Sequence, residues 1–307
     1  MRRRGHLRSG GVARVITEGY LVRHYQGRKG GRGPAIIDIA QDHLLAHLSE
    51  AGIFELGVSL KGGTAIRKFR AGNAGRFSTD LDFAGMDDAA ADLLVEIVQG
   101  AEVGPFTFEL EPLNGTQRML LHIASEFGDT EVPARLDLGR RGLWLSPERL
   151  PALPLPIHAQ YDVPLPAIPT ARIEEVIAEK LARYRRTSLA RDLYDLAWLS
   201  HRPFDEPLVR RMTALKVWSD VVDDGLGEKP WNPEDILRPR SEAEFEPEAI
   251  GYLTTAVDII RWIDDVRNRF VFLRDLDEEE GRLQRCSRAE EWEARKMIEA
   301  LDRDEEA

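Results

Sequence analysis

Apolar residues recur at intervals of three and four positions along residues 34–52, a period that predicts an amphipathic helix. A short apolar run at 56–60 predicts a strand, and an apolar stripe over 88–98 predicts a second helix. Gly128-Asp129 would make a turn between the last two of three extended segments, which lie at 106–111, 118–127 and 132–138. Helices that are separate from a largely local sheet are typical of an α+β fold.

The second half of the chain begins with a proline-rich stretch. Seven prolines lie within residues 147–169, and this density forbids a long helix, so we expect a linker or an extended crossover there. Beyond it, apolar stripes with helical spacing predict a mostly helical domain, with helices that include 208–222 and 249–272. The predicted division is a basic N-terminal arm at 1–33, a core at 34–146, the linker at 147–169 and a helical domain at 170–307.

A strand with polar chemistry on one face is predicted at residues 76–83, RFSTDLDF. Side chains alternate between the two faces of a strand, so its core-facing set would be Phe77, Thr79, Leu81 and Phe83. Ser78, Asp80 and Asp82 would then share the opposite face. Two carboxylates held side by side repel each other unless a cation or a shared proton relieves them, and oxygen ligands suit Mg²⁺.

The preceding segment, LKGGTAIRKF, offers a place for phosphate groups. Lys61, Gly62, Gly63 and Thr64 follow the apolar run and open a short helical stretch at 64–69. Glycines let the backbone approach a ligand closely, and the free N–H groups at a helix start point toward an anion. The spacing matches neither the Walker P-loop nor the dinucleotide-binding fingerprint. A phosphate seat followed by an Asp-x-Asp strand is what a metal-dependent nucleotidyl transferase needs.

These motifs, together with Lys180 and the segment RDLYDL at 191–196, resemble the AbiEii/AbiGii group. That group comprises the nucleotidyl transferase toxins of type IV toxin–antitoxin systems, with the mycobacterial MenT toxins as relatives. The resemblance implies a polymerase-β-like nucleotidyl transferase core with a mixed sheet, followed by a helical domain that contributes to the active site. It also implies Mg²⁺ (or Mn²⁺), a nucleoside triphosphate (NTP) as co-substrate, a cognate antitoxin encoded alongside and, for some members, nucleotide addition to the tRNA acceptor end.

A third carboxylate lies on the strand predicted at 132–138. The core-facing residues of that strand would be Val132, Ala134, Leu136 and Leu138. Asp137 and Arg135 would share its other face. In polymerase-β-like enzymes a third acid on a neighbouring strand completes the metal site, so the metal-binding set would be Asp80, Asp82 and Asp137. A salt bridge from Asp137 to Arg135 or Arg140 is an equally open explanation.

Lys180 lies within the apolar stripe of the helix that follows the proline-rich stretch. Such a lysine can extend its ammonium group to solvent, whereas the family order favours a lysine that reaches the triphosphate. Its distance along the chain to Asp195 suffices for one helix, a turn and a return, so the two side chains could meet over the same cleft. The alternative for Asp195 is an exposed ion pair with Arg191.

These arguments and the resemblance define the candidate site residues. The expected catalytic set is Asp80, Asp82, Lys180 and Asp195. The expected nucleotide-binding set is Lys61, Gly62, Gly63, Thr64, Arg67, Ser78 and Asp192. For Asp192 the choice between a role in the site and a purely structural role stays open.

Composition limits the classes of protein that fit. The formal net charge of −11 argues against an indiscriminate nucleic-acid binder, because phosphate contacts require Lys and Arg. Basic residues are nevertheless concentrated at 1–34 and at 180–191, where a local RNA-binding surface could form; a solvated tail and a solvated helix face are the alternatives. Cys286 is the single cysteine, and no apolar run approaches the length of a membrane span, so a cytoplasmic protein without membrane contact is expected.

The favoured function is transfer of a nucleoside monophosphate (NMP) from an NTP to an acceptor. The favoured acceptor is the 3′ end of tRNA, and the result would be a block of translation. Two alternatives stay open: a transferase that modifies a protein or a small molecule such as an antibiotic, and a non-catalytic binding module with a vestigial site. An RNA acceptor demands a basic track beside the cleft, whereas a small acceptor does not.

Overall fold

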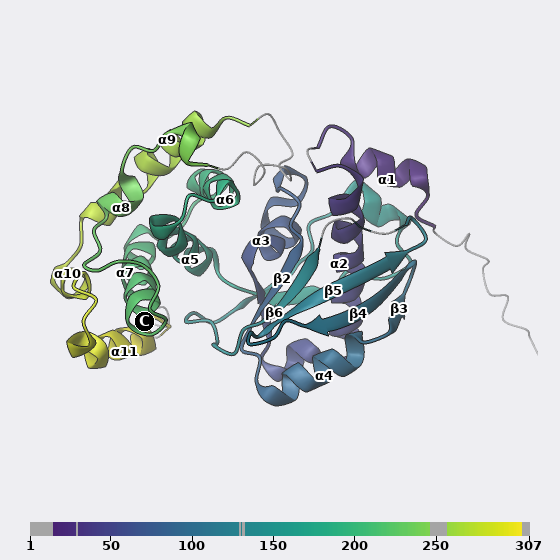
Figure 1. The fold of residues 1–307 in the computed structure, drawn as a ribbon, viewed down its shortest axis with the longest axis horizontal. Helices are drawn as coiled ribbons and strands as arrows, with labels where there is room; N and C mark the ends of the chain where they lie inside the picture. The colour runs from purple at the N-terminus through teal and green to yellow at the C-terminus, as the bar shows by residue number, and fades with distance from the viewer. Residues whose placement is uncertain (1–14, 29, 129, 131–132, 246–256, 303–307) are drawn as a thin grey trace, which may run out of the picture.

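The computed structural model describes residues 15–28, 30–128, 130, 133–245 and 257–302. They form two parts, each with its own hydrophobic core (Figure 1). One part is built on an eight-stranded sheet, and the other consists of helices. The predicted α+β class is confirmed.

The sheet is mixed, with the strand order β3-β4-β5-β6-β2-β1-β8-β7. In chain order its strands are β1 (Ser59–Lys61), β2 (Asp80–Ala84), β3 (Ala101–Val103), β4 (Phe106–Pro112), β5 (Arg118–Ser125), β6 (Ala134–Leu138), β7 (Glu148–Pro151) and β8 (Ala167–Thr170). The extended segments expected at 106–111, 118–127 and 132–138 correspond to β4, β5 and β6. Asp129, in the turn predicted between β5 and β6, lies outside the described residues.

β2 lies inside the sheet and carries two of the predicted site residues, Asp80 and Asp82. It runs antiparallel to β1 and parallel to β6, so that Asp82 is level with Lys61 on one side and with Asp137 on the other. This register joins three motifs that are far apart in the chain. It therefore gathers their polar side chains at one place on the sheet.

The strand predicted at 76–83 begins four residues later than expected, at Asp80. Before Asp80, the carbonyl groups of Phe77 and Ser78 accept hydrogen bonds from the side chains of Arg76 and Gln41, not from a neighbouring strand. The predicted alternation of faces holds for three of the four core-facing positions, whereas Thr79 is only half-buried. The buried core residues of this segment are Phe77, Leu81 and Phe83.

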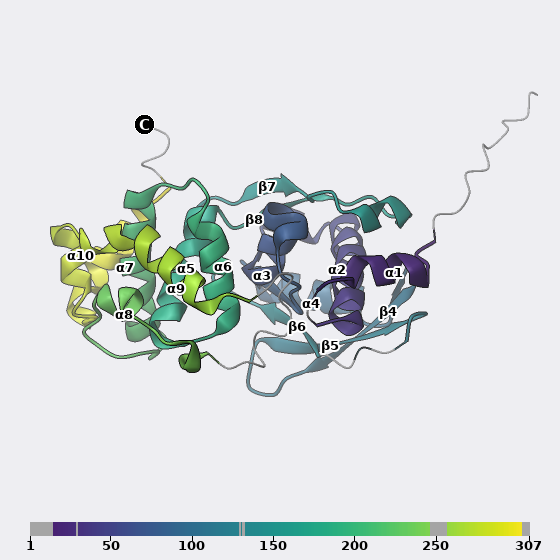
Figure 2. The same ribbon diagram turned by 90° about the horizontal axis from the view of Figure 1, so that it is seen from above.

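Among the described residues, four α-helices accompany the sheet. They are α1 (Glu18–Tyr25), α2 (Arg32–Glu50), α3 (Gly62–Ala65), which continues into the π-helical segment η2 (Ile66–Ala71), and α4 (Asp88–Val98). The helices predicted at 34–52 and 88–98 are α2 and α4. α1 packs against α2 at the end of this part that is remote from the helical part (Figure 2).

The described residues of the predicted basic arm at 1–33 pack against the core, and the division of the chain at residue 33 stays a prediction. Leu21 of α1 is fully buried, and His24 Nε2 lies 2.9 Å from Asp38 Oδ2 on α2. Arg28 donates a hydrogen bond to the carbonyl of Asn73. A single short helix offers too few apolar positions to reveal its burial from the sequence. Residues 1–14 lie outside the described residues.

The proline-rich stretch at 147–169 is more than a linker, because β7 and β8 belong to the sheet. Prolines lack the N–H group that a strand donates, and strands that contain them are tolerated mainly at sheet edges. β7 is such an edge strand, and β8 pairs with β1 only through Leu60 and Thr170. A domain boundary near residue 170 stays a prediction.

The helical part consists of α5 (Ile173–Arg186), α6 (Ala190–Ser200), α7 (Glu206–Val222), α8 (Glu234–Leu237), α9 (Ile259–Arg269), α10 (Glu278–Leu283) and α11 (Glu291–Ala300). The helices predicted at 208–222 and 249–272 correspond to α7 and α9, although residues 246–256 lie outside the described ones. Within the described ranges, no helix is both long enough and apolar enough to cross a membrane.

Candidate active site

A cavity of about 380 Å³ lies where the sheet meets the helical part. Its wall is rich in charge. Its basic residues are Lys61, Arg76, Arg118, Arg135, Arg141, Lys180, Arg183, Arg186, Arg191 and Lys216, and its acidic residues are Asp80, Asp82, Asp137, Glu179, Asp220 and Asp224. A cavity with more basic than acidic side chains, in a chain whose net charge is −11, suits a polyanionic ligand.

The three predicted metal-binding carboxylates all line this cavity. Asp80 and Asp82 come from β2, and Asp137 comes from β6, level with Asp82. Burial raises the pKa of Asp82 to about 6, and the neighbouring carboxylates of Asp80 and Asp137 add to the shift. An oxygen-rich site in which the acids repel one another suits a hard divalent cation.

Two of these carboxylates also have cationic neighbours. Asp137 Oδ2 accepts a hydrogen bond from Arg118 Nε at 2.9 Å, so its salt bridge is with β5 and not with Arg135 or Arg140. Asp80 Oδ2 lies 3.8 Å from Arg191 Nη1 of α6. In the part of the chain that the structure describes, no three His, Cys, Asp or Glu side chains are arranged as a ready metal site. Metal binding by this set therefore stays a proposal.

The glycine turn after β1 packs directly against the acidic strand. Gly62 has φ +75°, and a Cβ atom there would lie 1.9 Å from Asp82 Oδ2. A Cβ atom on Gly63 would lie 2.7 Å from Arg76 Nη2 and 2.8 Å from Ser78 Oγ. Only glycine fits at these two positions without displacing side chains of the cavity. The predicted proximity of the KGGT segment and the Asp-x-Asp strand is confirmed.

Thr64 differs from the other residues of this segment because it does not line the cavity. Its side chain is fully buried, and Oγ1 donates a hydrogen bond to the backbone carbonyl of Asp80. The bond ties α3 to the start of β2. Thr64 therefore supports the site from behind, and the prediction that it binds the nucleotide directly is not supported by its position.

Lys61 is held by a chain of charged groups that the sequence did not reveal. Lys61 Nζ and Lys216 Nζ each lie 3.2 Å from Glu179 Oε1, and Lys216 also bonds to Glu175 at 2.7 Å. Burial alone would raise the pKa of Glu179, but the two ammonium groups outweigh it and lower the pKa to about 2. The signal in the sequence that could have pointed to Glu179 is its position directly before Lys180. Lys216 lies outside every motif.

Lys180 and Asp195 meet, as predicted. Lys180 Nζ lies 2.7 Å from Asp195 Oδ2 and 3.3 Å from Asp192 Oδ1. Arg76 donates two hydrogen bonds to Asp195, at 3.0 and 2.8 Å, and Arg183 donates two to Asp192. These contacts take the place of the alternative, an ion pair between Asp195 and Arg191.

The two aspartates nevertheless sit behind the cavity wall. Asp192 and Asp195 are buried and are not among the residues that line the cavity, whereas Lys180, Arg76 and Arg183 are. Burial opposes ionisation of both acids, but their cationic partners lower both pKa values. The aspartates thus hold three cations at the wall. The predictions that Asp195 acts chemically and that Asp192 binds the nucleotide are not supported by this position.

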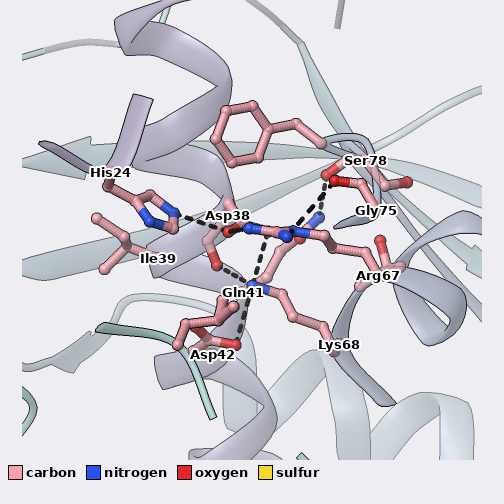
Figure 3. Close-up of polar contacts among 12 residues, drawn as sticks. His24, Asp38, Ile39, Gln41, Asp42, Arg67, Lys68, Gly75 and Ser78 are labelled. Atoms are coloured by element: carbon pink, nitrogen blue, oxygen red, sulfur yellow. Dashed lines mark hydrogen bonds and ion pairs between the residues drawn. The ribbon is translucent and has the colours of Figure 1, made fainter. Parts of the chain in front are cut away.

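Arg67 does not line the cavity, so the prediction that it binds the nucleotide is not supported by its position. It is buried, and its Nε and Nη2 bond to Asp38 at 3.3 and 3.1 Å (Figure 3). Nη1 donates to the carbonyl of Gly72. The helical period of the sequence could not reveal this direction, because η2 is a wider, π-helical turn.

The chain matches the model of a family described as "Nucleotidyl transferase AbiEii toxin, Type IV TA system" over residues 43–269. Among solved structures, MenT4, a nucleotidyltransferase toxin from Mycobacterium tuberculosis H37Rv, is 44% identical with a TM-score of 0.90; the match covers 94% of this chain and 99% of that one. JHP933 from Helicobacter pylori is 16% identical with a TM-score of 0.43, over 85% of this chain and 94% of that one. No curated protein matches.

The family model spans most of the chain, and the likeness to MenT4 extends over nearly all of it. The cavity contains what nucleotidyl transfer requires: carboxylates on adjacent strands, a glycine turn against them and a basic wall. The chain therefore belongs to the AbiEii family, the nucleotidyl transferase toxins of type IV toxin–antitoxin systems.

Proposed function

We propose that this nucleotidyl transferase moves an NMP from an NTP to the 3′ end of tRNA in a reaction that needs a divalent cation, and so blocks translation. Family membership establishes the transferase class. The acceptor, the metal and the effect on translation are the proposed part. The observation that carries the proposal is the cavity, in which carboxylates from β2 and β6 share a wall with an excess of basic side chains.

Three carboxylates would hold the cation: Asp80, Asp82 and Asp137. Their fit to Mg²⁺ or Mn²⁺ rests on the oxygen donors and on their mutual repulsion, which raises the pKa of the buried Asp82. When bound, such a cation supplies charge neutralisation for the attacking and leaving oxygens of a phosphoryl transfer. Replacement of any of the three by a neutral residue should therefore stop transfer.

The remaining side chains bind and orient the triphosphate. Gly62 and Gly63 let the backbone of the turn approach the phosphate groups, with Lys61 and Ser78 beside them. The acceptor hydroxyl attacks the α-phosphorus, a new P–O bond forms, and the bond to the leaving pyrophosphate breaks. Lys180, held at the wall by acids behind it, offsets the charge that develops on the pyrophosphate.

A tRNA acceptor explains the basic residues that lie beyond the needs of the triphosphate. Arg118 and Arg135 come from the sheet, and Arg186 and Arg191 come from α5 and α6. Together they provide cations on both sides of the carboxylates, where the backbone of an RNA end could pass. A small acceptor would not require such a track. The acceptor and the NTP meet in the cytoplasm, and a cognate antitoxin encoded alongside would restrain the activity there.

The deciding experiment incubates the purified protein with each labelled NTP in turn, Mg²⁺ and total tRNA. Label on tRNA is expected for the wild type, and treatment with a chelator should abolish it. Asp82→Asn should give no label. Asp88→Asn is the matched control, because Asp88 is an exposed acid that pairs with Arg140 on the surface of α4 and does not line the cavity.

Each other outcome contradicts a defined part of the proposal. Label on the protein itself but not on tRNA would show that tRNA is not the acceptor. Full labelling in the presence of the chelator would show that the reaction needs no divalent cation. Equal labelling by Asp82→Asn and Asp88→Asn would show that the Asp82 carboxylate is not needed for transfer, provided that both variants show the melting temperature of the wild type.

A further inference from the structure

Residues 72–78 are held by their carbonyl groups, and we refer to them as the clamped segment. Side chains from four separate parts of the chain donate these hydrogen bonds. The pairs are Arg67 to Gly72 and Gly75, Arg28 to Asn73 and Gly75, Tyr194 to Ala74, and Gln41 to Ser78. The Tyr194 and Gln41 bonds measure 2.7 and 3.0 Å. A loop with so many side-chain donors has one defined course.

The clamp rests on a buried cluster of charges around Asp38 of α2 (Figure 3). Asp38 is fully buried, pairs with Arg67, and lies 2.8 Å from Lys68 Nζ and 2.9 Å from His24 Nε2. Burial opposes its ionisation, but Arg67 and Lys68 outweigh this and hold the pKa of Asp38 well below its usual range. Arg67 is thereby fixed as a donor to the clamped segment.

The clamped segment delivers two side chains to the active site. Arg76 and Ser78 line the cavity, and both lie against Gly63 of the phosphate-binding turn. Arg76 is also bonded to Asp195 of the helical part. A shift of the clamped segment would therefore move groups that touch the triphosphate, although none of the clamping side chains lines the cavity.

Gln41 is the most informative of the donors. It is buried, and Nε2 donates to the Ser78 carbonyl, but Oε1 has no hydrogen-bond partner among the residues that the structure describes. A buried amide that satisfies only one of its two polar atoms is a poor choice for stability alone. Its one bond, however, fixes Ser78, which lies two residues before the start of β2.

We propose that Gln41 and Arg28 are positioning residues for nucleotidyl transfer, which act by fixing the clamped segment so that Arg76 and Ser78 meet the phosphate groups of the NTP. The buried Asp38–Arg67 pair is the base on which this arrangement stands. The inference rests on the transferase activity of the family and on the NTP site of the proposed function. It does not depend on tRNA as the acceptor.

The test compares Gln41→Met with His47→Leu, on the same helix. Each variant removes one side-chain bond to a backbone carbonyl, but His47 bonds to Ile97 of α4, at 3.3 Å, far from the clamped segment in the chain and outside the cavity. We expect similar small shifts in melting temperature. Only Gln41→Met should lower kcat/KM for the NTP, by about tenfold or more, because displacement of groups that contact the substrate is costly in rate.

A second variant, Arg28→Met, acts on the same segment from the turn that follows α1. The double variant with Arg28→Met and Gln41→Met should lose less kcat/KM than the product of the two single losses, since both substitutions perturb the clamped segment. The double variant with Gln41→Met and His47→Leu should lose kcat/KM by the product of the two single losses. If Gln41→Met does not fold, Arg28→Met alone is expected to show the same loss of kcat/KM.

Calorimetric titration of NTP with Mg²⁺ provides a readout without any acceptor, and we expect a raised Kd for Gln41→Met and an unchanged one for His47→Leu. Wild-type kcat/KM and Kd in folded Gln41→Met and Arg28→Met would overturn the inference. So would equal losses in His47→Leu. Failure of the wild type to label tRNA would instead refute the acceptor of the proposed function, while the titration still tests the positioning residues.

Discussion

Replacement of Gly62 by alanine tests whether the glycine turn must lie against the carboxylates. A new Cβ atom would lie 1.9 Å from Oδ2, 2.9 Å from Cγ and 3.2 Å from Cβ of Asp82. Rotation of the carboxylate about the Cβ–Cγ bond cannot relieve this contact, because Cγ stays in place at 2.9 Å. The positive φ of Gly62, +75°, adds a backbone cost of about 1–2 kcal/mol for an L-residue.

Gly57→Ala separates the two effects. Gly57 has φ +81°, but a Cβ atom there would meet no atom within 4 Å. We expect both variants to lose about 1–2 kcal/mol of unfolding free energy from the backbone, measured by urea denaturation. Only Gly62→Ala should lose NMP incorporation, by about 100-fold, because its clash moves Asp82, which we propose holds the cation at the reacting phosphate.

Two results would refute this reasoning. If Gly62→Ala keeps wild-type incorporation, Asp82 does not need the position that it occupies against the turn. If Gly57→Ala loses as much activity as Gly62→Ala, general backbone strain and not the displaced carboxylate governs the rate. Incorporation should be measured well below both melting temperatures, so that unfolded protein does not contribute.

Three further predictions concern charge. Asp195→Ala leaves Arg76 and Lys180 without their buried acid and should lower the unfolding free energy by about 3–5 kcal/mol in urea denaturation. Glu179, whose pKa is lowered from 4.5 to about 2, contributes stability that is fully present above pH 4.5 and is lost as the pH falls toward 2; Glu179→Gln should therefore show a shallower fall in melting temperature over that interval. A rise in salt from about 50 to 200 mM should weaken tRNA binding about tenfold or more in a filter-binding assay, whereas a salt-independent Kd would argue against a basic RNA track.

The parts of the site that the sequence predicted are those that depend on local geometry. Alternation along residues 76–83 placed Asp80 and Asp82 on one face and Phe77 in the core, because the side-chain period of an extended segment needs no tertiary information. The KGGT turn lies near the Asp-x-Asp strand in the sequence, so their contact required only the antiparallel pairing of β1 with β2. The helix pair that brings Lys180 to Asp195 is likewise local.

The corrections concern directions and partners that tertiary structure decides. Arg67 points to Asp38, which precedes it by 29 residues and lies on a different helix. Arg118 pairs with Asp137 because β5 and β6 are neighbours in the sheet, a register that no spacing encodes. Lys216 reaches Glu179 from α7, beyond every motif. Such pairs become visible only when the packing of whole elements is known.

The distribution of charge explains why the active site lies where the two parts meet. The sheet supplies the three carboxylates, which repel one another, and α5 to α7 supply much of the basic wall, which is also self-repelling. Acids behind the wall, Asp192 and Asp195, keep their cationic partners in place before a substrate arrives. An NTP carried with a divalent cation would satisfy both surfaces at once, the phosphates against the basic wall and the cation against the acids. Half of the basic side chains that line the cavity come from the helical part, so we expect this part to contribute to binding of the triphosphate.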